Sequence, residues 1–174
     1  RFITVRITPA EHAGRISSAL YETRSLAWYR RPEDGMVEVE EQFDDYVVSA
    51  IRVVEALVAE GGGRLGSFNL GISSELDEAD GRKLGLGSSA AVTVATVRAV
   101  ATFYGMAADD LTVYKLAMLA SDTVQPIGSG GDIAASAVTG WVDYASPDRV
   151  WLRRARQRAQ ARGGTGDLLE SDWP

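Results

Sequence analysis

Four small residues in a short stretch give the first sign of chemistry in this sequence. Gly85 and Gly87 are followed at once by Ser88 and Ser89, within "KLGLGSSAA" at residues 83–91. Glycines allow a ligand to approach the backbone closely, and the first N–H groups of a helix are unpaired and carry the positive end of its dipole. Serine hydroxyls can reach phosphate oxygens or a magnesium ion. The stretch predicts a phosphate-binding loop that opens a helix, although a tight turn into a packed helix would use the same glycines.

A second loop of the same kind spans residues 128–131 and reads "GSGG". Asp132 follows it and opens a helix of small residues, where it can serve as a helix cap. The alternative is a role in phosphoryl transfer, which needs donors for the phosphate, a metal, and a carboxylate near the acceptor. If the two loops face one another across a phosphate, the first holds the anion and Asp132 contacts the attacking group.

Two well-known phosphate loops fit the first stretch poorly. The Walker pattern ends in Gly-Lys-Ser/Thr, which is missing here. The spacing of Gly85, Gly87 and Ala90 matches the G-x-G-x-x-A of dinucleotide-binding folds. However, a polar segment and not an apolar strand precedes Gly85, and Asp109 lies at a helix start and not at the end of a strand. A dinucleotide site is therefore disfavoured.

Hydrophobic periodicity predicts the elements that must position these loops. Alternation with period two indicates strands at residues 2–7, 16–21, 26–29, 36–40, 64–74 and 140–146. Helical spacing of Val47, Ile51, Val54 and Val58 indicates a helix capped by Asp44 or Asp45. Further helices are expected at residues 88–104, from Asp109 or Asp110 to about residue 120, and at residues 132–140. We expect an α+β fold with helices packed on one face of a mostly antiparallel sheet.

Composition excludes several classes of protein. The chain has 174 residues, a formal net charge of −6 and no cysteine, which argues against a nucleic-acid-binding surface and rules out disulfides and thiolate metal sites. The single histidine, His12, lies in a polar stretch and is expected to be solvated. No apolar run approaches the ~20 residues of a membrane span, and the opening residues do not form a signal peptide. These features predict a globular protein with neither nucleic acid nor membrane as a partner.

Six arginines crowd residues 149–162 with no acidic residue among them. They can form the solvated face of a helix that leads to a further domain. They can also help to gather an anionic substrate, because they locally offset an acidic body.

The two loops, quoted as "KLGLGSSAAVTVATVRAV" and "QPIGSGGDIAASAVTG", resemble the GHMP kinases, and the second resembles the phosphomevalonate kinases among them. "YASPDR", the basic segment and "LLESDWP" are similar to the same group. The resemblance implies a cytoplasmic enzyme that uses ATP and Mg²⁺ to convert 5-phosphomevalonate into 5-diphosphomevalonate, in the mevalonate route to isoprenoids. Mevalonate kinase is the near alternative, but its loop carries a histidine that Val124, Gln125 and Pro126 do not supply.

The resemblance also implies roles for individual residues. Ser88 or Ser89 would help to hold magnesium, and Asp132 would act on the acceptor phosphate as base or orienting carboxylate. Ser129 and Lys83 would contact phosphates of the substrate or nucleotide, although Lys83 can equally be a solvated loop charge. The loop around the ATP phosphates would be formed by Gly85, Leu86, Gly87, Ser88, Ser89 and Ala90.

The resemblance implies a division of the chain as well. Residues 1–148 would be the N-terminal, ATP-binding domain without its first strands, and residues 149–174 a basic segment that connects to a C-terminal domain beyond Pro174. Uncovered sheet edge and apolar surface at these seams would favour association, with a homodimer as one form. A non-catalytic fragment that binds a nucleotide is the alternative to an enzyme.

Overall fold

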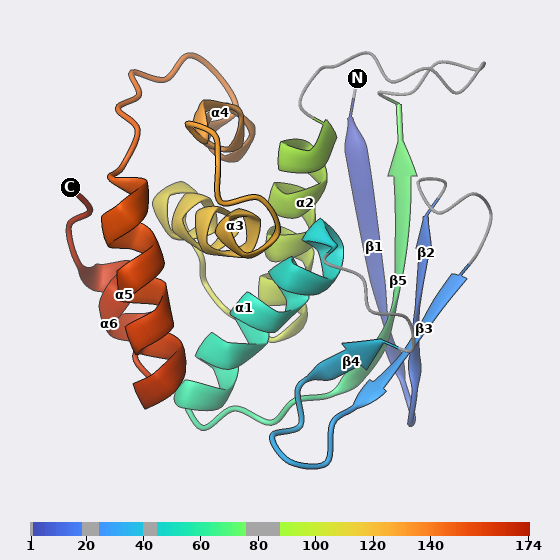
Figure 1. The fold of residues 1–174 in the computed structure, drawn as a ribbon. Helices are drawn as coiled ribbons and strands as arrows, with labels where there is room; N and C mark the ends of the chain where they lie inside the picture. Colours follow the sequence, from blue (N-terminus) through green and yellow to red (C-terminus); the bar gives the residue numbers. More distant parts are fainter. Residues whose placement is uncertain (1, 19–24, 40–44, 76–87) are drawn as a thin grey trace.

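A sheet and a layer of helices make up the fold, as Figure 1 shows in the computed structural model, which describes residues 2–18, 25–39, 45–75 and 88–174. In that view the helices lie on one side of the sheet, with α2 (Ser88–Phe103) against β1 (Ile3–Ala10) and α1 (Tyr46–Glu60) in contact with β4 (Val37–Val39). This is the arrangement that the sequence predicts, and the α+β fold is confirmed.

The sheet has the strand order β1-β5-β2-β3-β4. Its strands are β1 (Ile3–Ala10), β2 (Gly14–Ser18), β3 (Ser25–Arg30), β4 (Val37–Val39) and β5 (Ser67–Ser74). Neighbouring strands are antiparallel except β2 and β5, which are parallel. On β1 the side chains of Thr4, Arg6 and Thr8 are exposed while their neighbours pack against the core. One face of this strand is therefore solvated and the other meets the helices, as the alternation predicts.

The first four helices begin and end close to their predicted limits, whereas the sequence analysis gives no limits for the last two. They are α1 (Tyr46–Glu60), α2 (Ser88–Phe103), α3 (Asp110–Val124), α4 (Gly131–Val138), α5 (Arg149–Arg162) and α6 (Thr165–Glu170). Asp45 caps α1 by accepting a hydrogen bond from the N–H of Val47, and Asp109 caps α3 in the same way from Thr112. In the described part of the chain, no helix combines the length and the apolar character needed to cross a membrane.

Aromatic rings fill the space between the sheet and the helices. The Trp28 and Phe68 rings lie 4.9 Å apart, and Phe103 at the end of α2 meets Phe68 edge-on at 5.3 Å. Gly14 on β2 is essential to this packing, because a Cβ at that position would lie 2.1 Å from both the Phe68 carbonyl oxygen and the Trp28 ring.

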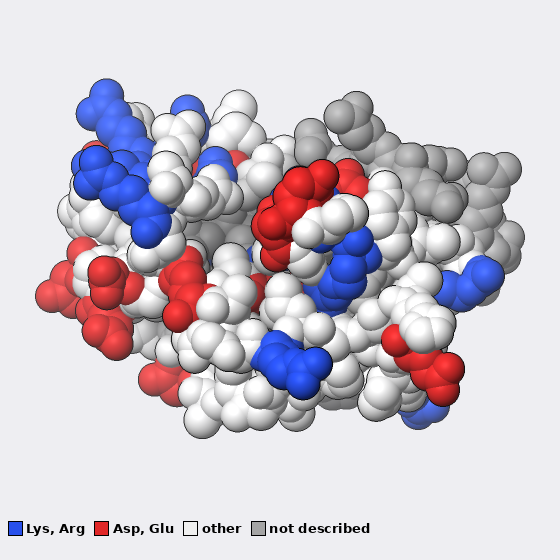
Figure 2. Space-filling view, turned by 90° about the horizontal axis from the view of Figure 1, so that it is seen from below, with Lys and Arg blue, Asp and Glu red and all other residues white. Residues whose placement is uncertain are grey.

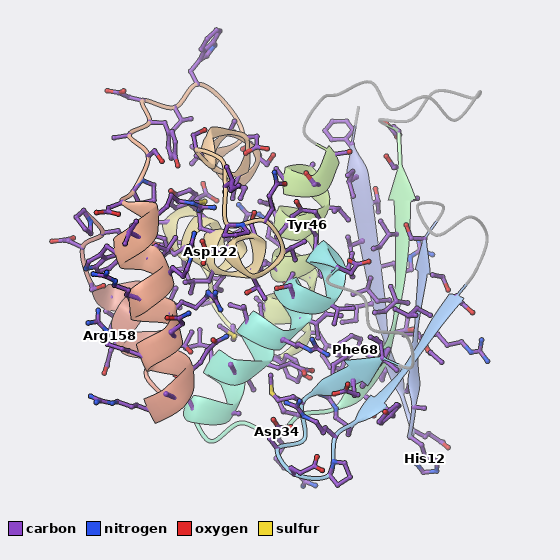
Figure 3. The ribbon with its side chains drawn as sticks, viewed as in Figure 1. His12, Asp34, Tyr46, Phe68, Asp122 and Arg158 are labelled. Carbon is purple, nitrogen blue, oxygen red and sulfur yellow. The ribbon has the colours of Figure 1, made fainter. Side chains whose placement is uncertain are left out.

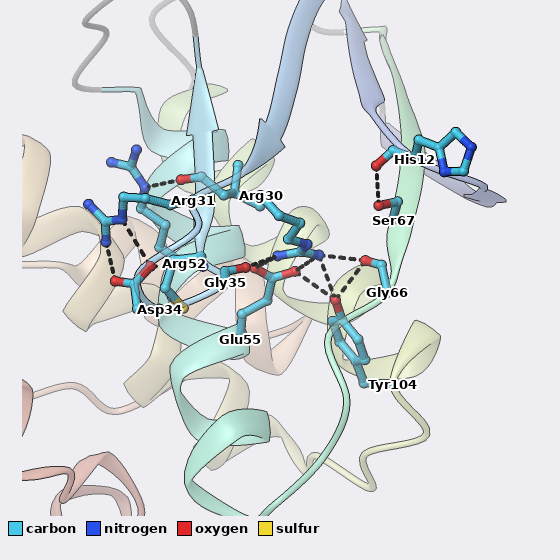
Figure 4. Close-up of polar contacts among 12 residues, drawn as sticks. His12, Arg30, Arg31, Asp34, Gly35, Arg52, Glu55, Gly66, Ser67 and Tyr104 are labelled. Carbon is cyan, nitrogen blue, oxygen red and sulfur yellow. Dashed lines mark hydrogen bonds and ion pairs between the residues drawn. The ribbon is translucent and has the colours of Figure 1, made fainter.

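A buried ion pair joins the helix layer to the sheet (Figure 4). Glu55 of α1 is fully buried and accepts two hydrogen bonds from Arg30 of β3, at 2.6 and 2.7 Å. Tyr104, which follows α2, donates to the same carboxylate at 2.6 Å. Burial raises the pKa of Tyr104 above its ordinary value, and the bond to Glu55 raises it further. Every oxygen of the carboxylate is thus paired, as a buried charge requires.

Residues 149–174 form α5 and α6, which pack against α3, with α6 also contacting α1. Leu152, Ala155, Ala159 and Leu168 are buried in the common core. Lys115 of α3 donates to the carbonyl oxygens of Leu169 and Ser171, each at 2.7 Å. The N–H of Asp148 donates to the carbonyl oxygen of Pro174 at 2.6 Å, so both ends of the segment meet.

The strand predicted at residues 140–146 is wrong. Residues 141–148 carry no regular secondary structure. After α4 the chain turns sharply, with Thr139 at φ 53° and Gly140 at φ 156°. The following residues then use side chains, described below, to hold the second glycine-rich loop. Trp141 and Val142 are exposed and only Tyr144 is partly buried, so the alternation of residue types here corresponds neither to a buried face nor to a paired strand.

Candidate functional site

The first candidate loop ends where α2 begins, at Ser88, as the sequence predicts. Ser88 and Ser89 occupy the first turn of the helix and are partly exposed, whereas Ala90 is buried. The small Ala90 side chain lets the helix start pack closely against its surroundings. Lys83, Gly85, Leu86 and Gly87 lie outside the described residues, so their predicted roles stay predictions.

The second candidate loop takes the backbone conformations that its glycines permit. Gly128 has φ 121° and Gly130 has φ 82°, both in the region that side chains disfavour. Gly130 precedes α4 as its N-cap residue, without a side-chain cap. Asp132 lies in the first turn, is exposed, and accepts a hydrogen bond from the N–H of Ile133 at 3.0 Å. Its carboxylate is therefore accessible, and it is not the N-cap residue that the sequence offered as one alternative.

Ser129 within this loop has both its oxygens engaged. Its side-chain Oγ accepts a hydrogen bond from the N–H of Gly131 at 3.3 Å. Its carbonyl oxygen accepts from the hydroxyls of Tyr144, at 2.5 Å, and Ser146, at 3.0 Å. The segment after α4 therefore folds back to hold the loop before α4.

Two residues of α3, spaced one helical turn apart, pack against this loop and the segment that holds it. Tyr114 lies within 3.2 Å of the Tyr144 hydroxyl, and burial followed by this hydrogen bond raises the Tyr114 pKa above its ordinary value. A Cβ on Gly130 would meet the sulfur of Met118 at 2.3 Å. Tyr114 and Met118 are thus the side chains against which the glycine turn is packed.

The two helix starts belong to elements that are in contact. Helix α2 packs against α4, and Figure 1 shows the beginning of α2 and the whole of α4 at the same upper end of the molecule. Arg98 of α2 donates to the carbonyl oxygen of Ala137 in α4, at 2.7 Å, and to the Asp110 carboxylate of α3, at 2.6 Å. This bond joins the second half of α2 to the last turn of α4, so the packing holds the two helices together, with Ser88 and Ser89 in the first turn of one and Asp132 in the first turn of the other.

Such an end of the molecule has the chemistry of an anion site. Unpaired N–H groups and the positive end of each helix dipole attract phosphate oxygens. The hydroxyl oxygens of Ser88 and Ser89 are also the kind of ligand that Mg²⁺ binds when it bridges to substrate phosphates. Across the described ranges, no cluster of three or more His, Asp or Glu side chains is placed to hold a metal by itself.

The arginines of α5 divide into two groups. Arg149 and Arg156 are only 17% and 15% exposed and flank the fully buried carboxylate of Asp122, at 3.8 and 3.1 Å. Arg158, in contrast, lies on the outer side of α5, as Figure 3 shows. The solvated face predicted for this segment is therefore wrong for Arg149 and Arg156, because the acid that they neutralise comes from α3 and is invisible in the local sequence.

Neither His12 nor a cavity beside α1 takes part in the candidate site. The His12 side chain is exposed, as predicted. A cavity of about 410 Å³ lies between α1, the β3–β4 turn and α5, and its lining contains none of the predicted site residues. Its three acids are already paired within the protein: Asp34 with Arg31, Asp45 with the N–H of Val47, and Glu60 with the N–H groups of Thr165 and Gly166. Figure 2 shows acidic and basic side chains interspersed on the face seen from below.

The sequence alone missed the residues that support the second loop. Tyr114, Met118 and Asp122 follow one another at i, i+4 and i+8 along one face of α3. This spacing could have indicated them, because polar side chains on an otherwise buried helix face usually contact a specific neighbouring segment. Tyr144 carried no such signal, because its partner is a backbone carbonyl.

Comparison with known proteins defines the class. Residues 45–140 match the family described as GHMP kinases N terminal domain, and the chain belongs to this family. It is 39% identical, over 186 aligned residues, to a phosphomevalonate kinase from a Streptomyces species, covering 100% of this chain and 48% of that protein.

Solved structures share the fold over almost the whole chain. A crystal structure of a Listeria innocua protein superposes with a TM-score of 0.83 and 29% identity, covering 99% of this chain and 46% of that one. Streptococcus pneumoniae phosphomevalonate kinase, solved in complex with phosphomevalonate and AMPPNP, gives a TM-score of 0.76 and 26% identity, covering 97% and 46%. The chain thus spans about half the length of the relatives that it matches.

Proposed function

We propose that this chain supplies the nucleotide- and acceptor-binding part of a phosphomevalonate kinase. The enzyme would transfer the terminal phosphoryl group of ATP to the phosphate of 5-phosphomevalonate, giving ADP and 5-diphosphomevalonate. The observation that carries the proposal is the 39% identity to a phosphomevalonate kinase along the entire chain. The position of α2 and α4 at one end of the molecule supports it, because phosphoryl transfer depends mainly on positioning and on charge stabilisation.

In this proposal the first turn of α2 holds the ATP phosphates. Its free N–H groups and dipole would stabilise the negative charge, and Ser88 or Ser89 would contribute a hydroxyl oxygen to Mg²⁺. The metal would neutralise charge on the transferring group. Gly85, Leu86, Gly87 and Ala90 would complete the loop, with Lys83 and Ser129 contacting phosphates.

Asp132 is assigned an orienting role at the acceptor. The second pKa of a phosphate monoester is about 6, so an acceptor phosphate is already deprotonated at pH 7 and has little need of a base. A bare carboxylate would repel this dianion. Asp132 would therefore act through a cation or a bound hydroxyl that it shares with the acceptor, fixing the attacking oxygen in line with the phosphoryl group.

The direct test is an ADP-release assay with the protein expressed from its complete reading frame. Phosphomevalonate, mevalonate, homoserine and galactose are offered in turn with Mg-ATP. We expect ADP release only when phosphomevalonate is the acceptor. Turnover of mevalonate in its place would make the protein a different GHMP kinase, and binding of Mg-ATP without turnover of any acceptor would make it a nucleotide-binding protein.

Single substitutions at the first turn of α2 refine this test. Ser88→Ala or Ser89→Ala should raise the KM for Mg-ATP, and if neither does, α2 is not the nucleotide site. The division at residue 148, the cytoplasmic location and a homodimer stay part of the proposal. Light scattering at increasing protein concentration tests the homodimer.

A further inference from the structure

The hydroxyl of Tyr144 occupies an unusual place in the second loop. It donates its hydrogen to the Ser129 carbonyl at 2.5 Å. A phenol has one hydrogen, so in the 3.2 Å contact between the two tyrosines Tyr114 must be the donor and Tyr144 the acceptor. The hydrogen bonds therefore run in one direction, from α3 through Tyr144 to the loop backbone.

The backbone that receives this bond is the part of the loop with least freedom. Gly130, directly after Ser129, has φ 82°, and a Cβ there would lie 3.1 Å from the Tyr144 hydroxyl. A Cβ on Gly131 would touch the Tyr144 ring at 3.4 Å. The ring thus covers both glycines while its hydroxyl fixes the carbonyl before them. Rotation of the 129–130 peptide would break the bond and would redirect the N-terminus of α4.

Tyr144 is in turn held by a series of aromatic rings. It meets Tyr114 edge-on at 6.1 Å, Tyr114 meets Trp173 at 6.3 Å, and Trp173 meets Trp151 of α5 at 6.3 Å. Burial and the contact with Tyr144 raise the pKa of Tyr114, so its phenol keeps the hydrogen that it donates. The support of the loop therefore comes from α3, from α5 and from the last residues of the chain.

We propose that Tyr144 is a positioning residue for phosphoryl transfer, which fixes the Ser129 carbonyl so that the Ser129 hydroxyl and the Asp132 carboxylate face the acceptor phosphate. This proposal rests on the function proposed above and extends it to a residue outside both glycine-rich loops. Ser146 is the weaker partner, because its hydroxyl donates to the same carbonyl at a longer distance, 3.0 Å, and also lies 3.4 Å from the carbonyl of Pro147.

Steady-state kinetics on Tyr144→Phe separate positioning from a merely structural role. The variant keeps the ring over the glycines and loses only the hydroxyl. We expect kcat with phosphomevalonate to fall by about 10- to 100-fold, since a misplacement near 1 Å can cost that much. The KM for ATP should stay within about twofold and the melting temperature within about 4 °C. Tyr114→Phe should lose less, because the Tyr144 bond to Ser129 survives.

Tyr29→Phe is the matched control, since this tyrosine is exposed on β3 and distant in sequence from the loop. A kcat for Tyr144→Phe equal to that of the control overturns the proposal. So does a fall in kcat that is accompanied by an equal weakening of ATP use and a collapse in melting temperature, because this would mark Tyr144 as a structural residue only.

An NMR experiment decides the positioning even if the protein phosphorylates no phosphomevalonate. In the ligand-free protein, Tyr144→Phe should shift the amide resonances of Gly130, Gly131 and Asp132 and speed their hydrogen exchange, while Tyr29→Phe leaves them in place. Unchanged amides would refute the positioning role. If the amide resonances shift but the protein turns over no phosphomevalonate, Tyr144 still positions the loop and only the proposed reaction is rejected.

Discussion

Asp132 is the residue on which the proposed chemistry is easiest to test. Its carboxylate is exposed in the first turn of α4 and bonds only to the adjacent N–H among the contacts described. Asp132→Asn keeps that bond and removes the charge. We expect kcat to fall by about 10²-fold, the cost of a misplaced reacting group, with little change in melting temperature. Asp143→Asn, in an exposed acid of the segment after α4, is the control, and a loss at Asp132 below tenfold would reduce the residue to a structural part of the helix start.

Among single residues, the sequence predicts the roles of those that interact with near neighbours along the chain. Asp45 and Asp109 cap their helices as expected, because a cap depends only on the next few residues. Glu55 and Asp122 are buried acids that the sequence did not reveal, since their partners Arg30 and Arg156 lie on other elements. The chemistry of Ser129 and Asp132 was visible in the sequence, whereas the tyrosine that holds them was not.

Among the elements, strand β2 depends on Gly14 for its fit under the aromatic core. The Cβ of an alanine there would lie 2.1 Å from the Trp28 ring and from a backbone oxygen that cannot move aside. Gly14→Ala should therefore lower the free energy of unfolding by about 3 kcal/mol, at the upper end for overpacked cores. Gly71→Ala on β5 is the control, because its Cβ would come no closer than 4.0 Å to the Arg6 carbonyl oxygen. Urea unfolding of both variants measures the difference, and equal stabilities would mean that the sheet relaxes around the added methyl group.

The hydrogen bond from Tyr104 to Glu55, where the end of α2 meets the sheet, predicts that the stability of the fold depends on pH. Burial, followed by the bond to Glu55, raises the pKa of Tyr104 in the folded state. An unfolded tyrosine loses its proton near a pKa of about 10. Above that pH the unfolded state binds fewer protons than the folded state, so the free energy of unfolding falls as pH rises. Below pH 10 the contribution is fully present.

Urea unfolding at intervals from pH 8 to pH 11.5 checks this expectation. Tyr104→Phe should make the decline above about pH 10 shallower, because one of the two tyrosines with raised pKa values is gone while Tyr114 still contributes, and Tyr29→Phe should leave the slope as it is in the parent. Parallel slopes for the Tyr104 variant and the parent would contradict the prediction.

The elements show where periodicity is informative and where it fails. Val47, Ile51 and Val54 are buried on one face of α1, since a helix with a clear apolar stripe must bury it. Residues 140–146 alternate equally well yet form no strand. After the turn at Thr139, which has a positive φ, the side chains of Tyr144 and Ser146 donate hydrogen bonds to the second glycine-rich loop. In this segment only Tyr144 is partly buried, so alternation of residue types alone does not establish a buried face or a pairing strand.

For the whole molecule, residues 149–174 are part of the core and not an appendage to it. Ending the chain after Asp148 would remove Leu152, Ala155 and Leu168 from the core and take Arg149 and Arg156 away from Asp122. Loss of a single buried leucine side chain costs about 2–5 kcal/mol, a large part of the 5–15 kcal/mol typical of a domain. We expect the shortened chain to be unfolded or insoluble at 25 °C, whereas the 174-residue chain unfolds cooperatively.

A milder variant keeps this expectation testable if the shortened chain cannot be purified. Leu152→Ala should cost about 2–5 kcal/mol in urea unfolding, because the side chain is fully buried. Val150→Ala, two residues away and 56% exposed, should cost under about 0.5 kcal/mol. A shortened chain with the melting temperature of the parent would show that α5 and α6 are independent of the rest.

The hydrogen bond between Asp148 and Pro174 has a practical consequence. It returns the last residue to the beginning of α5, and Figure 1 places the C-terminus beside that helix. Trp173, one residue earlier, already touches Tyr114 in the series of rings that ends at the second glycine-rich loop. A fluorescent label on a cysteine introduced at residue 174 would therefore lie close to the support of this loop, and changes in its emission during titration with phosphorylated compounds would report binding there.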